Sequence, residues 1–359
     1  MLTPATKRFG ILTSGGDCPG LNAAIRGVCR AAYDKYGMVG VGFADGYRGL
    51  INGDYRVLRR EDFWGILTRG GTILGSSREK PFKTTGLDYD VAGEKVSSIK
   101  EIYHELKLDC LVVLGGNGAH STAYKLAQEG LNVVGLPKTI DNDVKGTELC
   151  FGFHSALSIA TEAIDRLHTT AQSHNRTMVI ELMGHKAGWL ALYAGVAGGG
   201  DVILIPEIPY DIKIIGEHLK KRLQEGKGFS IVVVAEGAMS RKEAAMDKKS
   251  RKRRRENISI GYRIASEIKR ETKMETRTTV LGYVQRGGVP SAPDRALATC
   301  LGVAAADLLA YGKYNRMVCL SNDCVSSVDL SIPAGKTRTV PPNHYMLDAA
   351  LAVGACMGR

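Results

Sequence analysis

Residues 137–143 read Pro137-Lys138-Thr139-Ile140-Asp141-Asn142-Asp143 and follow an apolar run at residues 132–136. The apolar run predicts a buried strand of a parallel sheet, which Pro137 ends. Open α/β sheets bind their ligands beyond the carboxyl ends of such strands. A cation, a hydroxyl group and two carboxylates together could bind a metal-phosphate group and deprotonate an alcohol. Aspartate and asparagine also favour ordinary polar turns, so the choice between a site and a turn depends on the remaining sequence.

Two further turns repeat the arrangement of an apolar strand, glycines and a helix. Residues 9–13 precede Ser14-Gly15-Gly16-Asp17, and residues 110–114 precede Gly115-Gly116-Asn117-Gly118-Ala119. Apolar residues at helical spacing follow each turn, and the second helix is expected from about residue 121. Glycines allow the backbone to approach a phosphate closely, and a helix N-terminus offers unpaired N–H groups. Both turns are therefore candidate phosphate sites.

Strands and helices alternate through most of the chain, which predicts parallel sheets with helices on both faces. A second such series begins in the middle of the chain. We therefore expect an α/β fold of two similar three-layer domains, with mainly parallel sheets and an active-site cleft between them. The first domain is expected to comprise residues 1–152 and about 285–335, and the second residues 153–284 and about 336–359. The segment at residues 45–50 is expected to form a loop.

The composition is typical of a soluble globular protein that binds anions. The chain has 359 residues, of which 44% are hydrophobic and 24% charged, and its net charge is +11. This excess of positive charge suits phosphorylated metabolites or nucleic acid. Much of it lies in a basic run at residues 248–255, which has no interleaved aromatic residue and no nucleic-acid-binding module around it. We expect a solvated surface segment there and no nucleic-acid partner.

Eight cysteines without C-x-x-C spacing are typical of reduced thiols in a reducing compartment. The first residues lead into a strand without a signal-peptide h-region, and no apolar stretch is long enough to span a membrane. We expect a cytoplasmic protein with no membrane partner. Two nucleotide-binding classes are excluded, because the glycine turns lack both the G-x-G-x-x-G pattern of dehydrogenases and the G-x-x-x-x-G-K-[ST] pattern of Walker-type NTPases.

Six motifs in this order resemble the 6-phosphofructokinase family. They are Leu12-Thr13-Ser14-Gly15-Gly16-Asp17 with residues 19–26, Gly71-Thr72 with Gly75-Ser76 and Arg78, Gly115-Gly116-Asn117-Gly118, the stretch at residues 137–143, Glu181-Leu182-Met183-Gly184, and Gly282-Tyr283-Val284-Gln285-Arg286-Gly287-Gly288. The resemblance covers most of the chain. It implies a glycolytic kinase that transfers a phosphoryl group from ATP, with Mg²⁺, to the 1-hydroxyl of fructose 6-phosphate, giving fructose 1,6-bisphosphate.

The resemblance also implies a role for each matching residue. Asp141 would be the general base on the sugar hydroxyl, which must lose its proton as it attacks. Thr139 and Asp143 would order that site and its Mg²⁺, and Arg78 and Thr139 would stabilise the charge on the transferring phosphoryl group. ATP would be bound by Gly15, Gly16, Arg78, Gly116, Asn117, Gly118 and Ala119.

The sugar phosphate would be bound by a second set of residues: Thr139, Ile140, Asp141, Arg176, Met183, Gly184, His185, Glu236, Arg277, Tyr283, Val284, Gln285 and Arg286. In the family, arginines at the positions of Arg176 and Arg277 reach the 6-phosphate from a neighbouring subunit. The resemblance therefore implies a homo-oligomer, a dimer or a tetramer, with shared active sites. Arg26 and Arg30 match positions that bind a nucleotide effector in allosteric relatives, but they could equally be two solvated arginines on one helix face.

Two features leave the phosphoryl donor open. Gly118 favours ATP, because in this family glycine at that position leaves room for the α-phosphate. Lys138 and Tyr283 resemble the pyrophosphate-dependent enzymes and a mixed ATP-dependent subgroup that shares their features. We expect an ATP-dependent enzyme of the mixed subgroup, with pyrophosphate as the alternative donor.

Position 117 departs from the family pattern, because Asn117 stands where an aspartate usually binds Mg²⁺. An amide can coordinate Mg²⁺ through its oxygen but carries no charge, so we expect weaker metal binding at Asn117, with Asp143 as a second candidate ligand. Ala119 also replaces a small hydroxyl residue. Asn117 alone supports the further alternative of a non-catalytic regulatory subunit, and the retained carboxylates and arginines oppose it.

Overall fold

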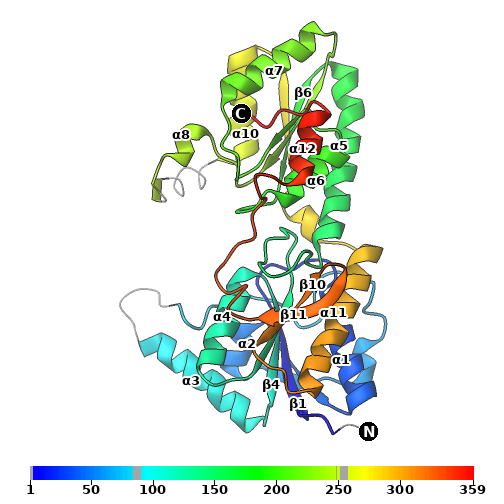
Figure 1. Ribbon diagram of the computed structural model, residues 1–359, viewed down its shortest axis with the longest axis vertical. Helices are drawn as coiled ribbons and strands as arrows, with labels where there is room; N and C mark the ends of the chain where they lie inside the picture. Colours follow the sequence, from blue (N-terminus) through cyan, green and yellow to red (C-terminus); the bar gives the residue numbers. More distant parts are fainter. Residues whose placement is uncertain (1–2, 84–89, 248, 251–257) are drawn as a thin grey trace. The chain divides into compact units, whose positions relative to one another are not determined.

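The structure is a computed structural model that describes residues 3–83, 90–247, 249–250 and 258–359. The chain divides into two compact units. Unit 1 comprises Met1–Ser155 and Arg286–Thr337, and unit 2 comprises Ala156–Gln285 and Arg338–Arg359. Each unit is a mainly parallel sheet covered by helices (Figure 1), which confirms the α/β class expected from the sequence.

Unit 1 contains a seven-stranded sheet in the order β11-β10-β5-β4-β1-β2-β3. The five central strands are parallel, and the edge strands β11 and β3 pair antiparallel with their neighbours. The strands are β1 (Arg8–Ser14), β2 (Val39–Phe43), β3 (Tyr55–Val57), β4 (Cys110–Gly115), β5 (Val133–Pro137), β10 (Arg316–Ser321) and β11 (Cys324–Asp329). Helices α1 (Leu21–Tyr36) and α11 (Ala292–Ala310) pack together on one face, and α2 (Tyr47–Asn52), α3 (Asp90–Glu105) and α4 (Asn117–Gln128) cover the other (Figure 1).

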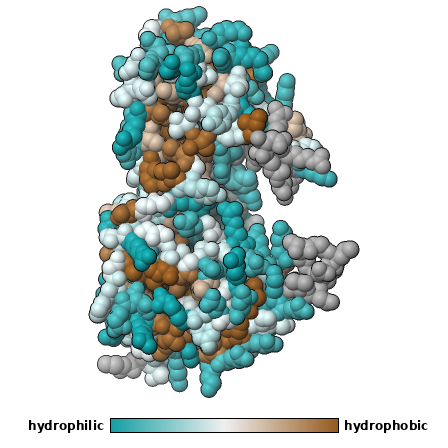
Figure 2. All heavy atoms as spheres, turned by 180° about the vertical axis from the view of Figure 1, so that it is seen from behind, coloured by the Kyte–Doolittle hydropathy of each residue, from teal (hydrophilic) through white to brown (hydrophobic). Residues whose placement is uncertain are grey.

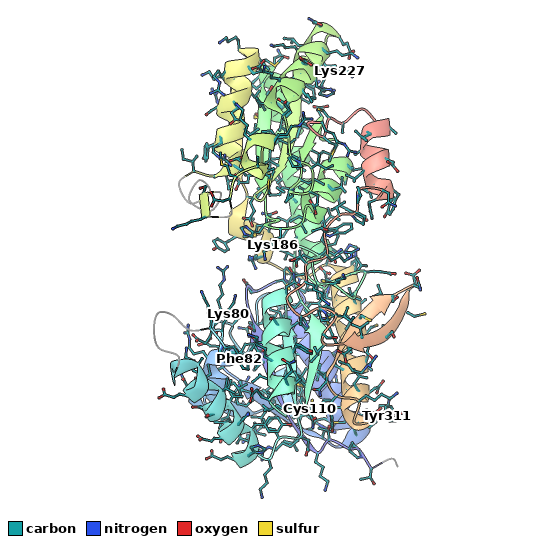
Figure 3. The ribbon with its side chains drawn as sticks, turned by 60° about the vertical axis from the view of Figure 1, so that its left-hand side comes forward. Lys80, Phe82, Cys110, Lys186, Lys227 and Tyr311 are labelled. Atoms are coloured by element: carbon teal, nitrogen blue, oxygen red, sulfur yellow. The ribbon has the colours of Figure 1, made fainter. Side chains whose placement is uncertain are left out.

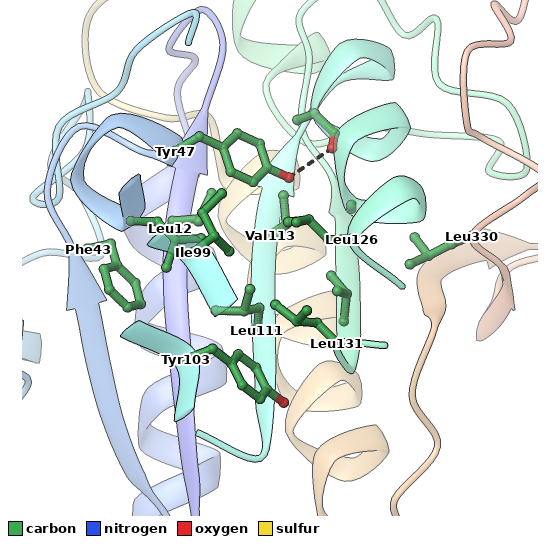
Figure 4. Packing of buried hydrophobic residues seen from close by; sticks show 14 of the residues in the cluster. Leu12, Phe43, Tyr47, Ile99, Tyr103, Leu111, Val113, Leu126, Leu131 and Leu330 are labelled. Atoms are coloured by element: carbon green, nitrogen blue, oxygen red, sulfur yellow. Dashed lines mark hydrogen bonds between the residues drawn. The ribbon is translucent and has the colours of Figure 1, made fainter. Parts of the chain in front are cut away.

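A hydrophobic core of unit 1 fills the space between its sheet and helices α2, α3 and α4. Leu12, Leu111 and Val113 on the central strands are fully buried and pack with residues of these helices (Figure 4). Each buried side chain of this size stabilises the fold by about 1.5–3 kcal/mol. The Tyr47 hydroxyl donates a hydrogen bond of 3.0 Å to the Ala119 carbonyl oxygen, which links α2 to the first turn of α4.

Unit 2 contains a four-stranded, all-parallel sheet in the order β7-β8-β6-β9. The strands are β6 (Thr177–Leu182), β7 (Val202–Leu204), β8 (Ser230–Ala235) and β9 (Thr276–Val280). The helices are α5 (Phe153–His174), α6 (Trp189–Ala197), α7 (Ile212–Gln224), α8 (Arg241–Ala244), α10 (Ile260–Thr272) and α12 (Tyr345–Ala352). Helices α7 and α10 pack together on one side of the sheet, and α12 packs on α6 on the other (Figure 1).

Two local expectations from the sequence are wrong. The second glycine turn is shorter than expected, because α4 begins at Asn117 rather than near residue 121. A glycine in the first turn of a helix is tolerated, and Gly116 precedes it in extended backbone. The expected loop at residues 45–50 contains most of α2, which Gly53 ends in the left-handed conformation. The glycines around Tyr47 therefore mark the two ends of a helix.

The surface carries hydrophilic residues with smaller groups of hydrophobic ones between them, as the face in Figure 2 illustrates. Most of the basic run at residues 248–255 lies outside the described residues, so its expected exposure stays a prediction. Among the described helices, none combines the length and the apolar character that crossing a membrane requires.

Candidate active site

The turn after β1 is built around an arginine that approaches the backbone closely. Gly15 has a φ of +91°, which favours glycine, and its N–H donates to the Ser77 carbonyl oxygen at 2.9 Å. The Arg286 Nη1 atom donates to the Asp17 carbonyl oxygen at 3.1 Å. A Cβ atom added to Gly16 would lie 1.9 Å from that Nη1 atom. Glycine at position 16 is therefore what allows the guanidinium group to lie against this turn.

Lys138 adds a second cation at the same place. Its side chain is only 4% exposed, and its Nζ atom donates a hydrogen bond to the Gly16 carbonyl oxygen. Burial lowers the pKa of Lys138, Arg286 lowers it further, and Asp17 and Asp141 raise it. Arg286 and Lys138 therefore lie together at the carboxyl ends of β1 and β5, where a phosphate could accept charge-assisted hydrogen bonds from both.

The loop after β5 is held in shape by Asn142, to which the sequence analysis assigned no role. Asn142 is buried, has a φ of +50°, and donates from Nδ2 to the Glu148 carbonyl oxygen at 3.2 Å. Its Oδ1 atom accepts from the Cys150 N–H at 2.9 Å. Asparagine tolerates the left-handed backbone better than most residues. Asn142 thus fixes the half-buried carboxylates of Asp141 and Asp143 on either side of it.

The N-terminus of α4 contacts this loop directly. The Asn117 Nδ2 atom donates to the backbone carbonyl oxygen of Asp143 at 3.1 Å and to its Oδ2 atom at 2.8 Å. The Asn117 Oδ1 atom is buried and has no hydrogen-bond partner within the described part of the chain. The first turn of a helix carries free N–H groups and a partial positive charge. This end of α4 therefore joins a backbone that could bind an anion to the Asp143 carboxylate of the next loop.

His120 contacts the same turn from within the core, and the sequence analysis gave this residue no role. It is fully buried, and its Nδ1 atom lies 3.0 Å from the Gly116 carbonyl oxygen. Burial lowers the pKa of His120 to about 4, so the ring is neutral near pH 7 and its Nδ1–H donates to that oxygen. A Cβ atom added to Gly135 would lie 2.7 Å from the imidazole, so this glycine in β5 makes room for the ring.

Gly118 and two exposed cations form the outer rim of the site. A Cβ atom at Gly118 would meet only the Lys80 side chain, at 3.8 Å, so the space beside this glycine is open. Arg78 follows Ser77, which forms a β-bridge with Ser14 at the end of β1. Arg78 and Lys80 are exposed and make no ion pair within the described residues. Lys80 (Figure 3) is another residue that was not expected from the sequence, although it lies two positions after Arg78.

In unit 2, three loops converge at the carboxyl ends of β6, β8 and β9. Gln285 is fully buried, accepts from the Met183 N–H at 3.3 Å and donates to the Gly282 carbonyl oxygen at 3.0 Å. A Cβ atom at Gly237 would lie 2.1 Å from the His185 carbonyl oxygen, which places the loop after β8 against the loop after β6. The structure thus brings together the predicted sugar-phosphate residues Met183, Gly184, His185, Glu236, Tyr283, Val284 and Gln285.

A known protein family matches most of this chain, including the turns after β1, β4 and β5. A model described as phosphofructokinase matches residues 8–309. The chain belongs to the phosphofructokinase family.

Three relatives each align with at least 94% of this chain. It is 64% identical to an ATP-dependent 6-phosphofructokinase from Spirochaeta thermophila, over 100% of this chain and 99% of the relative. It is 52% identical to ATP-dependent 6-phosphofructokinase 3 from Bacteroides thetaiotaomicron, over 98% and 100% of the two chains. A pyrophosphate–fructose 6-phosphate 1-phosphotransferase from Amycolatopsis methanolica is 45% identical over 94% and 97%.

A solved structure agrees with the fold of this phosphofructokinase family member. It superposes on phosphofructokinase from Saccharomyces cerevisiae with a TM-score of 0.77, at 30% identity and over 90% of this chain. The superposition covers 45% of the yeast chain, so the present chain spans slightly less than half of that protein.

Arg176 and Arg277, two of the predicted substrate-binding residues, lie away from the carboxyl-end loops of unit 2. Arg176 contacts the Glu275 carboxylate at 3.1 Å, and Arg277 pairs with the same carboxylate. Arg176 precedes β6, whereas Met183 follows it, and a six-residue strand is about 17 Å long. The two arginines are therefore at the amino end of the sheet in unit 2, and the other sugar-phosphate residues of that unit are at its carboxyl end.

Three other predicted residues, Arg286, Ala119 and Arg30, lie in unit 1. Arg286 lies with the turn after β1 in unit 1, rather than with Tyr283 and Val284, which are 73% and 67% exposed in unit 2. The Ala119 side chain packs against Gly115 in the core, because a Cβ atom at Gly115 would lie 2.1 Å from it. Arg30 on α1 forms an exposed ion pair with Asp34 at 3.5 Å. Its predicted effector role, like that of Arg26, stays a prediction.

Among the described residues, the site offers oxygen ligands for Mg²⁺ but no complete set of protein ligands. No cluster of three or more His, Cys, Asp or Glu suited to a metal ion occurs within the described residues. The unpaired Asn117 Oδ1 atom and the adjacent Asp143 carboxylate are hard oxygen ligands. Magnesium in nucleotide enzymes usually takes one or two protein oxygens and completes its shell with phosphate and water. The residues present fit that pattern.

Proposed function

We propose that this chain transfers the γ-phosphoryl group of ATP to the 1-hydroxyl of fructose 6-phosphate, giving fructose 1,6-bisphosphate and ADP. One observation carries the proposal. The carboxyl edge of the unit 1 sheet combines open backbone donors, buried and exposed cations, and the carboxylate of Asp141. Relatives that are 64% and 52% identical, and that are named ATP-dependent 6-phosphofructokinases, support it.

Asp141 acts as the general base. As the sugar oxygen forms its bond to the γ-phosphorus, the bond from that phosphorus to the β,γ-bridging oxygen breaks, and the hydroxyl proton passes to the Asp141 carboxylate. The Asp141 N–H donates to the Thr139 Oγ1 atom at 3.1 Å, which orients the loop that carries the base. Ile140, buried between Thr139 and Asp141, anchors the same segment in the core.

Positive groups stabilise the charge on the transferring phosphoryl group. Arg78 and Lys80 are exposed at the rim, and Lys138 is fixed on the turn at Gly15 and Gly16. Preorganised cations and backbone N–H groups are the main contribution of the protein to phosphoryl transfer. Gly116, Asn117 and Gly118 provide such N–H groups, and Ala119 contributes through its backbone. Mg²⁺, held by Asp143 and Asn117, would neutralise phosphate charge when bound.

Unit 2 binds the sugar phosphate in this proposal, and unit 1 binds the nucleotide. Exposed His185 and Tyr283 provide hydrogen-bonding groups on the two loops that Gln285 links, and half-buried Glu236 provides another on the loop after β8. Arg286, docked beside Gly16, belongs with the phosphoryl-transfer groups as well as with the sugar-phosphate motif. The assignment would fail if isotope-labelled fructose 6-phosphate bound as tightly to a His185→Ala/Tyr283→Phe variant as to the wild type.

The chain also assembles into a homo-oligomer in this proposal. Arg176 and Arg277 lie at the amino end of the unit 2 sheet and share one carboxylate, Glu275. Their separation from the carboxyl-end loops of the same unit supports a role in the site of a neighbouring subunit. Mixing an Asp141→Asn variant with an Arg277→Ala variant, each nearly inactive alone, should restore activity in hybrid oligomers. No recovery, in mixtures where native mass spectrometry detects hybrids, would contradict shared sites.

The donor is ATP, because the space beside Gly118 is open and a side chain there would be the first obstacle to a larger nucleotide. The specific observation that favours pyrophosphate is buried Lys138, whose Nζ atom lies on the phosphate turn. A relative at 45% identity is named as a pyrophosphate enzyme.

Initial rates with fructose 6-phosphate and Mg²⁺ decide the donor, with ATP in one series and pyrophosphate in the other. We expect a rate with ATP. A rate with pyrophosphate alone would mean that Lys138 outweighs Gly118. No rate with either donor, in folded protein that still binds the sugar phosphate, would favour the regulatory-subunit alternative.

A further inference from the structure

Asn117 makes two hydrogen bonds to a single residue of another segment. Its Nδ2 atom donates to the Asp143 backbone carbonyl oxygen at 3.1 Å and to the Asp143 Oδ2 atom at 2.8 Å. The opposite amide orientation would place Asn117 Oδ1 against both of these oxygens, so the contacts themselves assign the nitrogen. Asn117 begins α4, and Asp143 lies in the loop after β5. The amide therefore ties two ligand-bearing segments of unit 1 together.

A carboxylate at position 117 could not make this tie. It would have no proton to donate at neutral pH, and its oxygen would lie about 3 Å from the Asp143 carboxylate, where like charges repel. Two carboxylates at that distance require a shared proton or a bound cation. The described residues provide no third acidic, histidine or cysteine ligand beside them. A cation at this place would therefore depend on ligands from outside the protein, such as phosphate oxygens.

We infer that, in the nucleotide-free enzyme, the Asn117 amide joins the first turn of α4 to Asp143 without a bridging cation. Mg²⁺ therefore enters this site only together with nucleotide phosphates. The nucleotide part rests on the proposed function, whereas the tie itself does not. Asn117 is a positioning residue here: it holds the first turn of α4 against the Asp143 loop, and its buried Oδ1 atom stays available to the incoming ion.

The test is the Asn117→Asp variant of the full chain, compared with Asn132→Asp as a matched control. Asn132 also donates from Nδ2 to a backbone carbonyl oxygen, that of Asp109 at 2.9 Å, but at the amino end of β5. Both variants lose one amide donor and gain one negative charge. In chelator, Asn117→Asp should lower the thermal midpoint by roughly 2–4 °C more than Asn132→Asp, and Mg²⁺ should restore only the former.

Metal binding without nucleotide gives the second readout. With Mn²⁺ as the probe, electron paramagnetic resonance should detect one bound ion per chain in Asn117→Asp, and none at the same concentration in the wild type or in Asn132→Asp. The exchanged pair Asn117→Asp/Asp143→Asn should recover the thermal midpoint in chelator, because a donor again faces a carboxylate.

Two outcomes would overturn the inference. One is binding of Mn²⁺ by nucleotide-free wild type as tightly as by Asn117→Asp. The other is an unchanged thermal midpoint of Asn117→Asp in chelator. A wild type that transfers no phosphoryl group from ATP, with these stability and Mn²⁺ results as expected, would overturn the proposed function and leave the tie in place. The two failures are therefore distinguishable.

Discussion

The carboxyl edges of the two sheets hold their candidate ligand groups in different ways. In unit 1 the candidate reacting groups contact neighbouring segments: Lys138 binds the glycine turn, Arg286 lies on Gly16, and Asn117 binds Asp143. In unit 2, buried Gln285 links the loop after β6 to the loop after β9, and the Tyr283 and Val284 side chains beside it are exposed. Groups that must stabilise a transition state benefit from being fixed before the reaction, whereas groups that recognise a substrate can rest on a fixed backbone.

The largest expected effect is at Asp141 in unit 1. Asp141→Asn keeps the shape of the side chain but cannot accept the hydroxyl proton, so kcat should fall by about 10³-fold. The Michaelis constants for ATP and fructose 6-phosphate should change little, because the loop is held by Asn142. Steady-state kinetics check this. Asp323→Asn, at an exposed turn, is the control, and a fall of less than tenfold at Asp141 would remove it as the base.

Gly16→Ala tests whether the contacts within unit 1 matter. The new methyl group would meet the Arg286 guanidinium, which can swing away, so the protein should stay folded while the rate with ATP falls about 10- to 100-fold. Binding of fructose 6-phosphate should be less affected than the rate, because Arg286 is only one of its proposed contacts and the others are on the unit 2 loops. Gly93→Ala in α3, where a Cβ atom meets no neighbour, is the matched control and should be neutral or slightly stabilising. A Gly16→Ala enzyme with the wild-type rate would contradict the role given to these unit 1 contacts.

Gln285→Leu tests the unit 2 side of the comparison. It leaves the Met183 N–H and the Gly282 carbonyl oxygen without their partner, at a cost of about 1–3 kcal/mol for each buried group. The Michaelis constant for fructose 6-phosphate should rise about tenfold, and that for ATP should not change. Exposed Gln172→Leu on α5 serves as the control. An equal effect on both substrates would mean that Gln285 supports more than the unit 2 loops.

The smallest expected effect is on stability and concerns His120. Its pKa in the folded protein, about 4, lies below the ordinary value of 6.5, so the unfolded chain binds the proton more readily. Stability is therefore complete above about pH 6.5 and falls by about 3 kcal/mol as the pH drops towards 4. His120→Gln should remove this part of the pH dependence in unfolding measured from pH 4 to 7. His104→Gln, at an exposed position on α3, should leave the pH dependence of stability unchanged. An unchanged pH dependence in His120→Gln would contradict the buried neutral ring.

Most of the candidate ligand-binding turns could be recognised in the sequence, because each occupies a few consecutive residues after an apolar run. The motifs at Gly15, Gly116 and Asp141 are of this kind. Lys80, His120 and Asn142 were missed for three different reasons. Lys80 belongs to no glycine turn, His120 acts through a backbone oxygen four residues earlier, and Asn142 acts through loop residues six and eight positions later.

The sequence by itself determined the α/β class, the phosphofructokinase family and the positions of the glycine turns after the strands, because strand periodicity and glycine turns are local. Only the tertiary structure decided that Arg286 lies on Gly16, that Asn117 donates to Asp143, and that Arg176 and Arg277 meet at Glu275. These contacts join residues that are 2 to 270 positions apart in the chain. Apart from Arg277 and Glu275, which are close in sequence, the partners are set by which segments the fold brings together, and no local pattern encodes that choice.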